Sequence, residues 1–135
     1  MIQIQRLGMA DDGTRELLKA RNALSRKRPR PDIAFEFLEA AWKRGNPEAA
    51  YALGTWYFHG KYVKEDKRIG VRLWREAAAL KEPNALYDLA VCYEKGVGVK
   101  SNPRKAFKLY LEAALRGETQ SVYEVGRCYY YGIGT

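Results

Sequence analysis

The chain has 135 residues and a formal net charge of +8, from 24 basic and 16 acidic residues. Its hydrophobic content of 47% is that of a globular protein and argues against a disordered chain. No apolar run approaches the ~20 residues that a membrane-spanning helix needs. The first residues also lack the layout of a signal peptide. We therefore expect a single domain, located in the cytoplasm and not bound to a membrane.

The N-terminal part of the chain differs from the rest. Residues 1–13 show no period, and residues 14–24 place Leu17, Leu18 and Leu24 at helical spacing. We interpret residues 1–28 as a lead-in followed by a degenerate capping helix, because stacked-repeat proteins need a polar cap at their ends. A basic loop with two prolines follows, and residues 33–44 again have a helical pattern. The repeats are expected to occupy residues 29–135.

The central stretch, residues 46–117, contains two copies of one sequence repeat with a period of 36 residues. The matching pairs include Tyr51 with Tyr87, Leu53 with Leu89, Tyr57 with Tyr93, Gly60 with Gly96, and Ala77-Ala78 with Ala113-Ala114. A third copy begins after Gly117 and stops at Thr135, halfway through the unit. Such a period predicts structural repeats that stack on one another.

Each unit reads as two helices. Asn46 and Pro47 are typical of the start of a helix, and Gly60 is typical of its end. Asp66 then indicates the start of a second helix, with Asn102 in the same place one repeat later. We predict an all-α fold, an α/α superhelical solenoid of helix–turn–helix repeats with a period of 36 residues. The last repeat is expected to be cut after its first helix.

Residues that recur between copies are expected to lie in the packed core. The recurring tyrosines are Tyr51, Tyr57, Tyr87, Tyr93, Tyr123 and Tyr129. Gly54 and Gly126 fall inside first helices, where glycine costs about 1 kcal/mol relative to alanine. A close approach of two helices at this position compensates for that cost.

The order A-x-Y-x-L-G-x-x-Y-x-x-G-x-x-V-x-x-D, followed by W-x-x-A-A, resembles the Sel-1-like repeat, a relative of the tetratricopeptide repeat. Residues 49–84 and 85–120 follow this order nearly throughout. Tyr62 departs from it where the family has a loop glycine, and Gly70 where it has alanine. The resemblance implies a solenoid that binds other proteins as a scaffold or adaptor, without catalysis of its own.

The cysteines and the single histidine do not form a recognisable catalytic or metal site. Cys92 and Cys128 are one period apart, too far for a disulfide if neighbouring helices are separated by the usual 8–10 Å or so. Two free thiols suit a reducing compartment. His59 has no third group to orient it for nucleophilic catalysis, and structural zinc needs four ligands. We expect no enzyme activity, no cofactor and no metal ion.

The positions that vary between first helices are free to contact a partner. Stacking requires only the recurring residues, and in solenoids of this kind the first helices line the concave side. We expect a polypeptide partner to bind there, with Trp56 and Arg127 projecting from the packed core. The predicted partner-binding residues are Thr55, Trp56, His59, Asp88, Val91, Lys95, Glu124, Arg127 and Tyr131.

A second hypothesis arises from the positive charge. Basic residues recur at helical spacing in the second helices and form a predicted basic stripe. Its members are Lys64, Arg68, Arg72, Arg75, Arg104, Lys105 and Lys108. Such a stripe suits nucleic acid or another anionic partner. A solvated helix face is the simpler interpretation, and the salt dependence of binding separates the two hypotheses.

The last helix carries Val122, Val125, Tyr129 and Ile133, with no second helix to cover them. Because each repeat buries its apolar face only against a neighbour, this face is expected to be exposed. Self-association through the C-terminal half-repeat, or membership of a longer repeat array, follows as a hypothesis.

Overall fold

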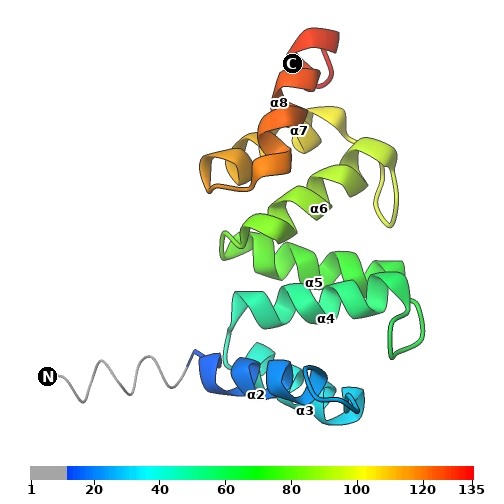
Figure 1. The fold of residues 1–135 in the computed structure, drawn as a ribbon. Helices are drawn as coiled ribbons and strands as arrows, with labels where there is room; N and C mark the ends of the chain where they lie inside the picture. The colour runs from blue at the N-terminus through cyan, green and yellow to red at the C-terminus, as the bar shows by residue number, and fades with distance from the viewer. Residues whose placement is uncertain (1–11) are drawn as a thin grey trace, which may run out of the picture.

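The computed structural model describes residues 12–135; the lead-in predicted for residues 1–13 lies almost wholly outside them. The described residues form seven helices, which Figure 1 shows stacked from the N-terminal to the C-terminal end. They are α2 (Thr14–Leu24), α3 (Pro31–Lys43), α4 (Pro47–His59), α5 (Lys67–Ala79), α6 (Pro83–Lys95), α7 (Pro103–Leu115) and α8 (Thr119–Tyr131). The all-α prediction is confirmed.

The helices pack as consecutive antiparallel neighbours. Helices α2 and α3, α4 and α5, and α6 and α7 form three close pairs. Each pair contacts the next through α3 and α4, α5 and α6, or α7 and α8. Thus α2, α4, α6 and α8 are first helices, and α3, α5 and α7 are second helices, as the sequence predicts. The degenerate helix α2 pairs with α3, while the proposed domain division between residues 28 and 29 stays a prediction.

The helix ends follow the capping residues that the sequence indicates. The Asn46 side-chain oxygen accepts a hydrogen bond of 3.0 Å from the backbone N–H of Ala49, at the start of α4. Asp66 caps α5 in the same way, with 3.1 Å to the N–H of Ile69. Gly60 ends α4 with a φ of 69°, in the left-handed region that glycine adopts without a Cβ clash.

In the two full repeats, an aromatic residue of the second helix, α5 or α7, packs against a tyrosine of its first helix. The rings of Tyr51 and Trp74 lie 6.2 Å apart, and those of Tyr87 and Tyr110 lie 5.9 Å apart. Trp74 and Tyr110 are buried. In addition, the indole N–H of Trp74 donates to the Tyr51 carbonyl oxygen at 3.2 Å. These pairs hold the two helices of a repeat together.

The recurring tyrosines are buried only where a second helix covers them. Tyr93 is buried, and Tyr51, Tyr57 and Tyr87 are half-buried. Tyr123 and Tyr129 of α8 are 72% and 62% exposed, so their predicted core position is wrong. The physical reason is that no second helix packs on α8 within the described residues. Val125 and Ile133, by contrast, pack against the core.

The close approach predicted at the helical glycines is present in one copy. A Cβ atom added to Gly54 would lie 2.5 Å from the Trp74 side chain and 3.0 Å from the Gly70 carbonyl oxygen. The same atom added to Gly126 would meet nothing within 4 Å. The two glycines occupy the same repeat position, so they form a matched pair for a test.

We predict that Gly54→Ala lowers the free energy of unfolding by about 1–3 kcal/mol, because the new methyl group forces Trp74 away from α4. Gly126→Ala should instead raise it by up to ~1 kcal/mol, since alanine favours a helix interior. Urea unfolding of both variants and the wild type, at a protein concentration at which the chain is monomeric, measures the two effects. Changes of the same sign would contradict the interpretation that α5 approaches Gly54 closely.

Candidate functional site

The first helices form one face of the stack, and two hollows lie on it. We call this surface, made by α2, α4, α6 and α8, the first-helix face. The N-terminal hollow has a volume of about 450 Å³ and is lined by Leu17, Ala20, Arg21, Leu24, Leu38, Glu48, Tyr51, Ala52, Trp56, Glu82 and Asn84. The C-terminal hollow has a volume of about 310 Å³ and is lined by Tyr87, Val91, Glu94, Lys95, Tyr110, Glu124 and Arg127.

The N-terminal hollow combines an apolar floor with acidic groups. Leu17 and Trp56 belong to the core and form part of the floor. Glu82 is only 7% exposed and caps α6, accepting a hydrogen bond of 2.7 Å from the backbone N–H of Ala85. Burial raises the pKa of Glu82, and the capping hydrogen bond opposes that rise. Arg21 and Glu48 form an ion pair on the rim.

A tyrosine–carboxylate bridge joins α4 to α6 beside this hollow. The hydroxyl of Tyr51 donates to the Asp88 carboxylate at 2.8 Å. Burial raises the pKa of Asp88, while the hydrogen bond from Tyr51 lowers it, and burial dominates. Burial and the neighbouring carboxylate also raise the pKa of Tyr51. The proton of this hydrogen bond therefore stays on the Tyr51 hydroxyl, and the bond holds the Asp88 side chain in place on the first-helix face.

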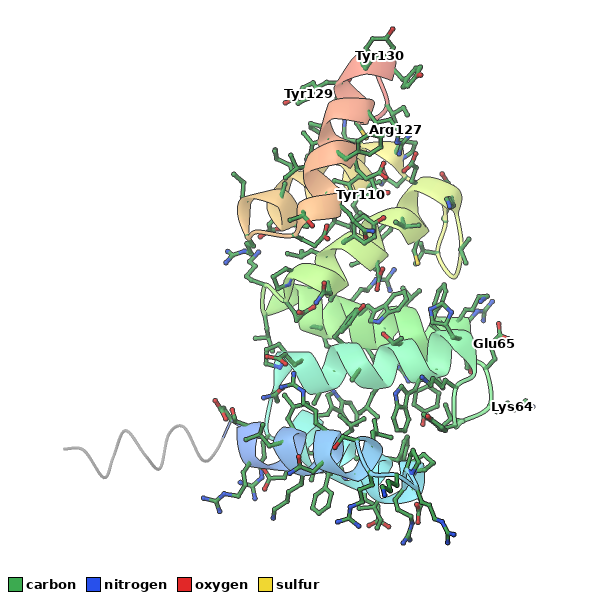
Figure 2. All side chains as sticks on the ribbon, in the orientation of Figure 1. Lys64, Glu65, Tyr110, Arg127, Tyr129 and Tyr130 are labelled. Atoms are coloured by element: carbon green, nitrogen blue, oxygen red, sulfur yellow. The ribbon has the colours of Figure 1, made fainter. Side chains whose placement is uncertain are left out.

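The C-terminal hollow is organised by an arginine that bridges two carboxylates. Nη2 of Arg127 lies 2.7 Å from both oxygens of Glu94, and its Nε donates to Glu124 at 2.6 Å. The hydroxyl of Tyr110 donates to Glu94 at 2.9 Å. Figure 2 shows Arg127 and Tyr110 in the same part of the stack. The network ties α8 to α6 and α7.

The charges of this network shift the pKa of its members. Burial raises the pKa of Glu94, but the hydrogen bonds from Arg127 and Tyr110 outweigh it, so the pKa falls below its ordinary value. Hydrogen bonds to Glu94 and Glu124 raise the pKa of Arg127. Both groups therefore stay charged at neutral pH.

The structure brings four of the predicted partner-binding residues together. Val91, Lys95, Glu124 and Arg127 line the C-terminal hollow. The other predicted residues lie apart from it. Thr55 donates to the Tyr51 carbonyl oxygen, His59 is exposed beside Phe58, Asp88 accepts from Tyr51, and Tyr131 is exposed beside Tyr130.

The expectation that Trp56 projects from the packed core is wrong. Trp56 is 6% exposed, and its ring lies between those of Phe35, 6.1 Å away, and Tyr62, 4.8 Å away. Helix α3 of the preceding pair and the turn after α4 cover it. Tyr62 has a φ of 65°, a conformation that glycine favours, and Gly98 has 71° at the same repeat position. Substituting Trp56 is therefore expected to destabilise the fold.

Arg127 is also not free, contrary to expectation, because two carboxylates hold it in place. Glu94, which Arg127 contacts, and Tyr110, which donates to Glu94, were not predicted from the sequence, and neither was Glu82. A usable indication was present, since Glu94 stands at the repeat position of Phe58, and an acid replacing an aromatic residue marks a changed environment.

The predicted basic stripe is exposed in its entirety. Lys64 lies in the turn before α5, as Figure 2 shows, and the other six residues lie on α5 and α7. Within residues 12–135, none of the seven forms an ion pair with a carboxylate. The stripe is therefore a surface of unneutralised positive charge.

The two cysteines are buried and unpaired, so the expectation of no disulfide is confirmed. Burial, with a smaller effect from Asp88, raises the pKa of Cys92 to about 11. Burial also raises the pKa of Cys128. Neither thiol has the environment of a nucleophile, which requires a depressed pKa and solvent access.

Within residues 12–135, no helix is both long enough and apolar enough to cross a bilayer. The same residues contain no group of three or more His, Cys, Asp or Glu side chains that could hold a metal ion.

We predict that Arg127→Gln lowers the free energy of unfolding by about 1–3 kcal/mol at pH 7, because Glu94 loses its charged partner. A depressed carboxylate pKa stabilises the fold above the pKa of the unfolded state, and this stabilisation disappears as the pH falls. The difference between variant and wild type should therefore shrink below about pH 4.3. Urea unfolding at several pH values measures it.

Lys95→Gln serves as the control. Lys95 lines the same hollow and is exposed, and its substitution by glutamine removes one positive charge, as Arg127→Gln does. It should change the unfolding free energy by less than about 0.5 kcal/mol at every pH. Equal losses in the two variants would mean that net charge matters and the network does not.

Comparisons with known proteins bear on the family. The Sel1 repeat model matches residues 47–82, 83–118 and 119–135. The fold is similar to that of a Sel1 repeat protein from Oxalobacter formigenes, with a TM-score of 0.81 and 26% identity over 93% of this chain and 96% of that one. A protective antigen of uropathogenic Escherichia coli with an SLR fold gives a TM-score of 0.85 and 25% identity, over 98% of this chain and 29% of the antigen.

Helicobacter pylori cysteine rich protein B has the same fold, with a TM-score of 0.73 and 22% identity over 89% of this chain and 90% of that one. No curated protein matches the sequence. The family model covers more than half of the chain, in the period and helix register that the sequence and the structure both display. The chain therefore belongs to the Sel1 repeat family.

Proposed function

We propose that this chain is a non-catalytic protein–protein interaction module that binds a polypeptide on the first-helix face. The observation that carries the proposal is the pair of hollows on that one face, one between α2 and α4 and one between α6 and α8. Two hollows along a face suit an extended segment better than a small compact ligand. The buried, unpaired thiols further support a reducing location such as the cytoplasm.

The lining of the hollows suggests the chemistry of the partner. The N-terminal hollow offers an apolar floor beside Glu48 and Glu82, and Asp88 lies next to it. An apolar side chain flanked by a basic residue fits this arrangement. The C-terminal hollow is already charge-balanced by the Arg127 network, so it suits hydrogen-bonding groups of the partner backbone.

We predict that Ala52→Arg weakens peptide binding about tenfold or more, because the long side chain fills the N-terminal hollow. Ala52 is half-buried on α4, and alanine and arginine have similar helix propensities, so the fold should persist. Peptides selected from a random phage-displayed library on the wild-type chain provide the ligands. Fluorescence anisotropy then measures their affinity for each variant.

Ala79→Arg is the matched control, since Ala79 is exposed near the end of the second helix α5 and the substitution adds the same charge. It should leave affinity within about twofold. Equal binding by wild type and Ala52→Arg, with wild-type melting temperatures, would contradict binding on this face.

The basic stripe supports a second candidate function, the binding of nucleic acid or another anionic partner. Seven exposed cations without carboxylate partners within the described residues favour it. A polyanion binder of this kind loses affinity steeply as salt rises, whereas a peptide seated in an apolar hollow does not.

We also propose that the chain self-associates through α8. The exposed surface of Tyr123, Gly126 and Tyr130 corresponds in register to Tyr51, Gly54 and Phe58, which α5 covers in α4. A hollow of about 340 Å³ lies at this place. A helix of a second copy can occupy it as α5 occupies the surface of α4.

We predict a molecular mass that rises with concentration in light scattering, and a monomer for Tyr123→Glu, which places a charge in the hollow. Leu80→Glu, at an exposed apolar residue distant in sequence from α8, should behave like the wild type. A wild-type chain that stays monomeric at all concentrations would rule out self-association.

A further inference from the structure

A cluster of donors lies around Tyr93, away from both hollows. Arg75 of α5 approaches the Tyr93 hydroxyl with Nη2 at 3.0 Å and Nε at 3.3 Å. Nζ of Lys105, from α7, lies 4.7 Å from the centroid of the same ring. The tyrosine is 6% exposed, whereas the arginine and the lysine are exposed. Two cations from different second helices thus meet over one buried ring.

Most of the N–H donors of Arg75 form no hydrogen bond within residues 12–135. A guanidinium has five N–H groups, and two of those of Arg75 are directed at Tyr93, which leaves three, including a pair suited to a bidentate contact. The tyrosine oxygen acts as acceptor, and its own proton has no acceptor among residues 12–135. Lys105 forms no ion pair within the same residues. The site presents only donors and positive charge.

The surplus of positive charge affects the pKa of Tyr93. Burial raises the pKa of Tyr93, but Arg75 and Lys105 together outweigh burial and lower it. Two like charges beside one ring repel each other, and a bound anion would relieve that repulsion.

The cluster is not required by the repeat. In the preceding repeat, Tyr57 stands in the place of Tyr93, with Glu39 and Ile69 in the places of Arg75 and Lys105. There the tyrosine ring packs edge-on against Phe35. Since stacking occurs without the two cations, their presence in one repeat points to a separate role.

The extent of the positive surface favours a compact anion over a polynucleotide. On α3, the positions equivalent to Arg68, Arg72 and Arg75 carry Asp32, Glu36 and Glu39. The acidic helix interrupts any basic track beyond α5. A long chain of phosphates would meet these carboxylates, whereas a single anion at Tyr93 would not.

We propose that Arg75, Lys105 and Tyr93 form a binding site for a single tetrahedral dianion of the phosphate-monoester class. The guanidinium offers a bidentate contact, the ammonium a second charge, and the tyrosine hydroxyl a neutral donor. This site sharpens the second candidate function and is independent of peptide binding on the first-helix face.

The test measures binding of inorganic phosphate and of N-acetyl-phosphoserine amide by isothermal titration calorimetry, with sodium chloride keeping the ionic strength constant. The variants are Arg75→Gln, Lys105→Gln and Tyr93→Phe, which keeps the buried ring. Lys108→Gln is the matched control, because it removes one exposed charge from the same stripe and does not contact Tyr93. Melting temperatures confirm that each variant is folded.

The wild type should bind at least one of the two probes, and tighter binding of the phosphoserine amide would identify a phosphorylated polypeptide as the source. Arg75→Gln and Lys105→Gln should each weaken binding about tenfold, Tyr93→Phe should weaken it severalfold, and Lys108→Gln should leave it within about twofold.

Two results would overturn the proposal. The first is no binding of either probe beyond the effect of chloride. The second is equal weakening by Arg75→Gln and Lys108→Gln. If a single-stranded oligonucleotide also bound, and lost affinity equally in those two variants, the stripe would be a diffuse polyanion surface and not a phosphate site.

Discussion

The two full repeats depend on one contact, in which an aromatic residue of the second helix, α5 or α7, lies across its first helix. Trp74 rests on Gly54 and beside Tyr51, and Tyr110 takes the same position beside Tyr87. The small residue at the contact sets how closely the two helices approach. Because each repeat contacts only its neighbours, this local distance recurs in both full repeats and sets how α4 and α6 lie on α5 and α7. Each hollow is lined in part by one of these two first helices.

The sequence predicts the structural features that recur in every repeat. It does not predict side-chain positions that depend on contacts found in one repeat only. Capping by Asn46 and Asp66, the end of α4 at Gly60 and the alternation of helices all follow from residues that act locally or repeat in register. The burial of Trp56 depends on Phe35 and Tyr62, and the positioning of Arg127 depends on Glu94. None of these partners recurs, so a periodic pattern does not predict their contacts. The break in the pattern at Glu94 indicates a changed environment, but only the three-dimensional contacts show where the two side chains lie.

The contact between the first and second helix differs at several positions between the two full repeats. In the first full repeat, Phe58 stacks on Trp74 at 4.6 Å. Helix α5 approaches α4 so closely there that a Cβ atom on Gly70 would lie 2.7 Å from the Phe58 Cβ and 2.9 Å from the Gly54 carbonyl oxygen, so this position requires glycine. In the next repeat, Glu94 replaces the phenylalanine, and alanine returns at the position of Gly70. Tyr110 replaces the tryptophan, and its hydroxyl needs the acceptor that Glu94 supplies. An apolar contact has thus been exchanged for a hydrogen-bonded one at the same place.

The residues at the helix contacts and the residues on the outer surface change separately from one repeat to the next. The outward positions of α3 and α5 differ in sign, with Asp32 and Glu36 against Arg68 and Arg72, and all four side chains are exposed. Reversing these two charges on a solvated helix face leaves the packing contact unchanged, because exposed charges contribute little to stability. The second-helix face is therefore free to vary from repeat to repeat, and the first-helix face varies independently of it. One scaffold can in this way present two surfaces whose binding properties are set by different residues.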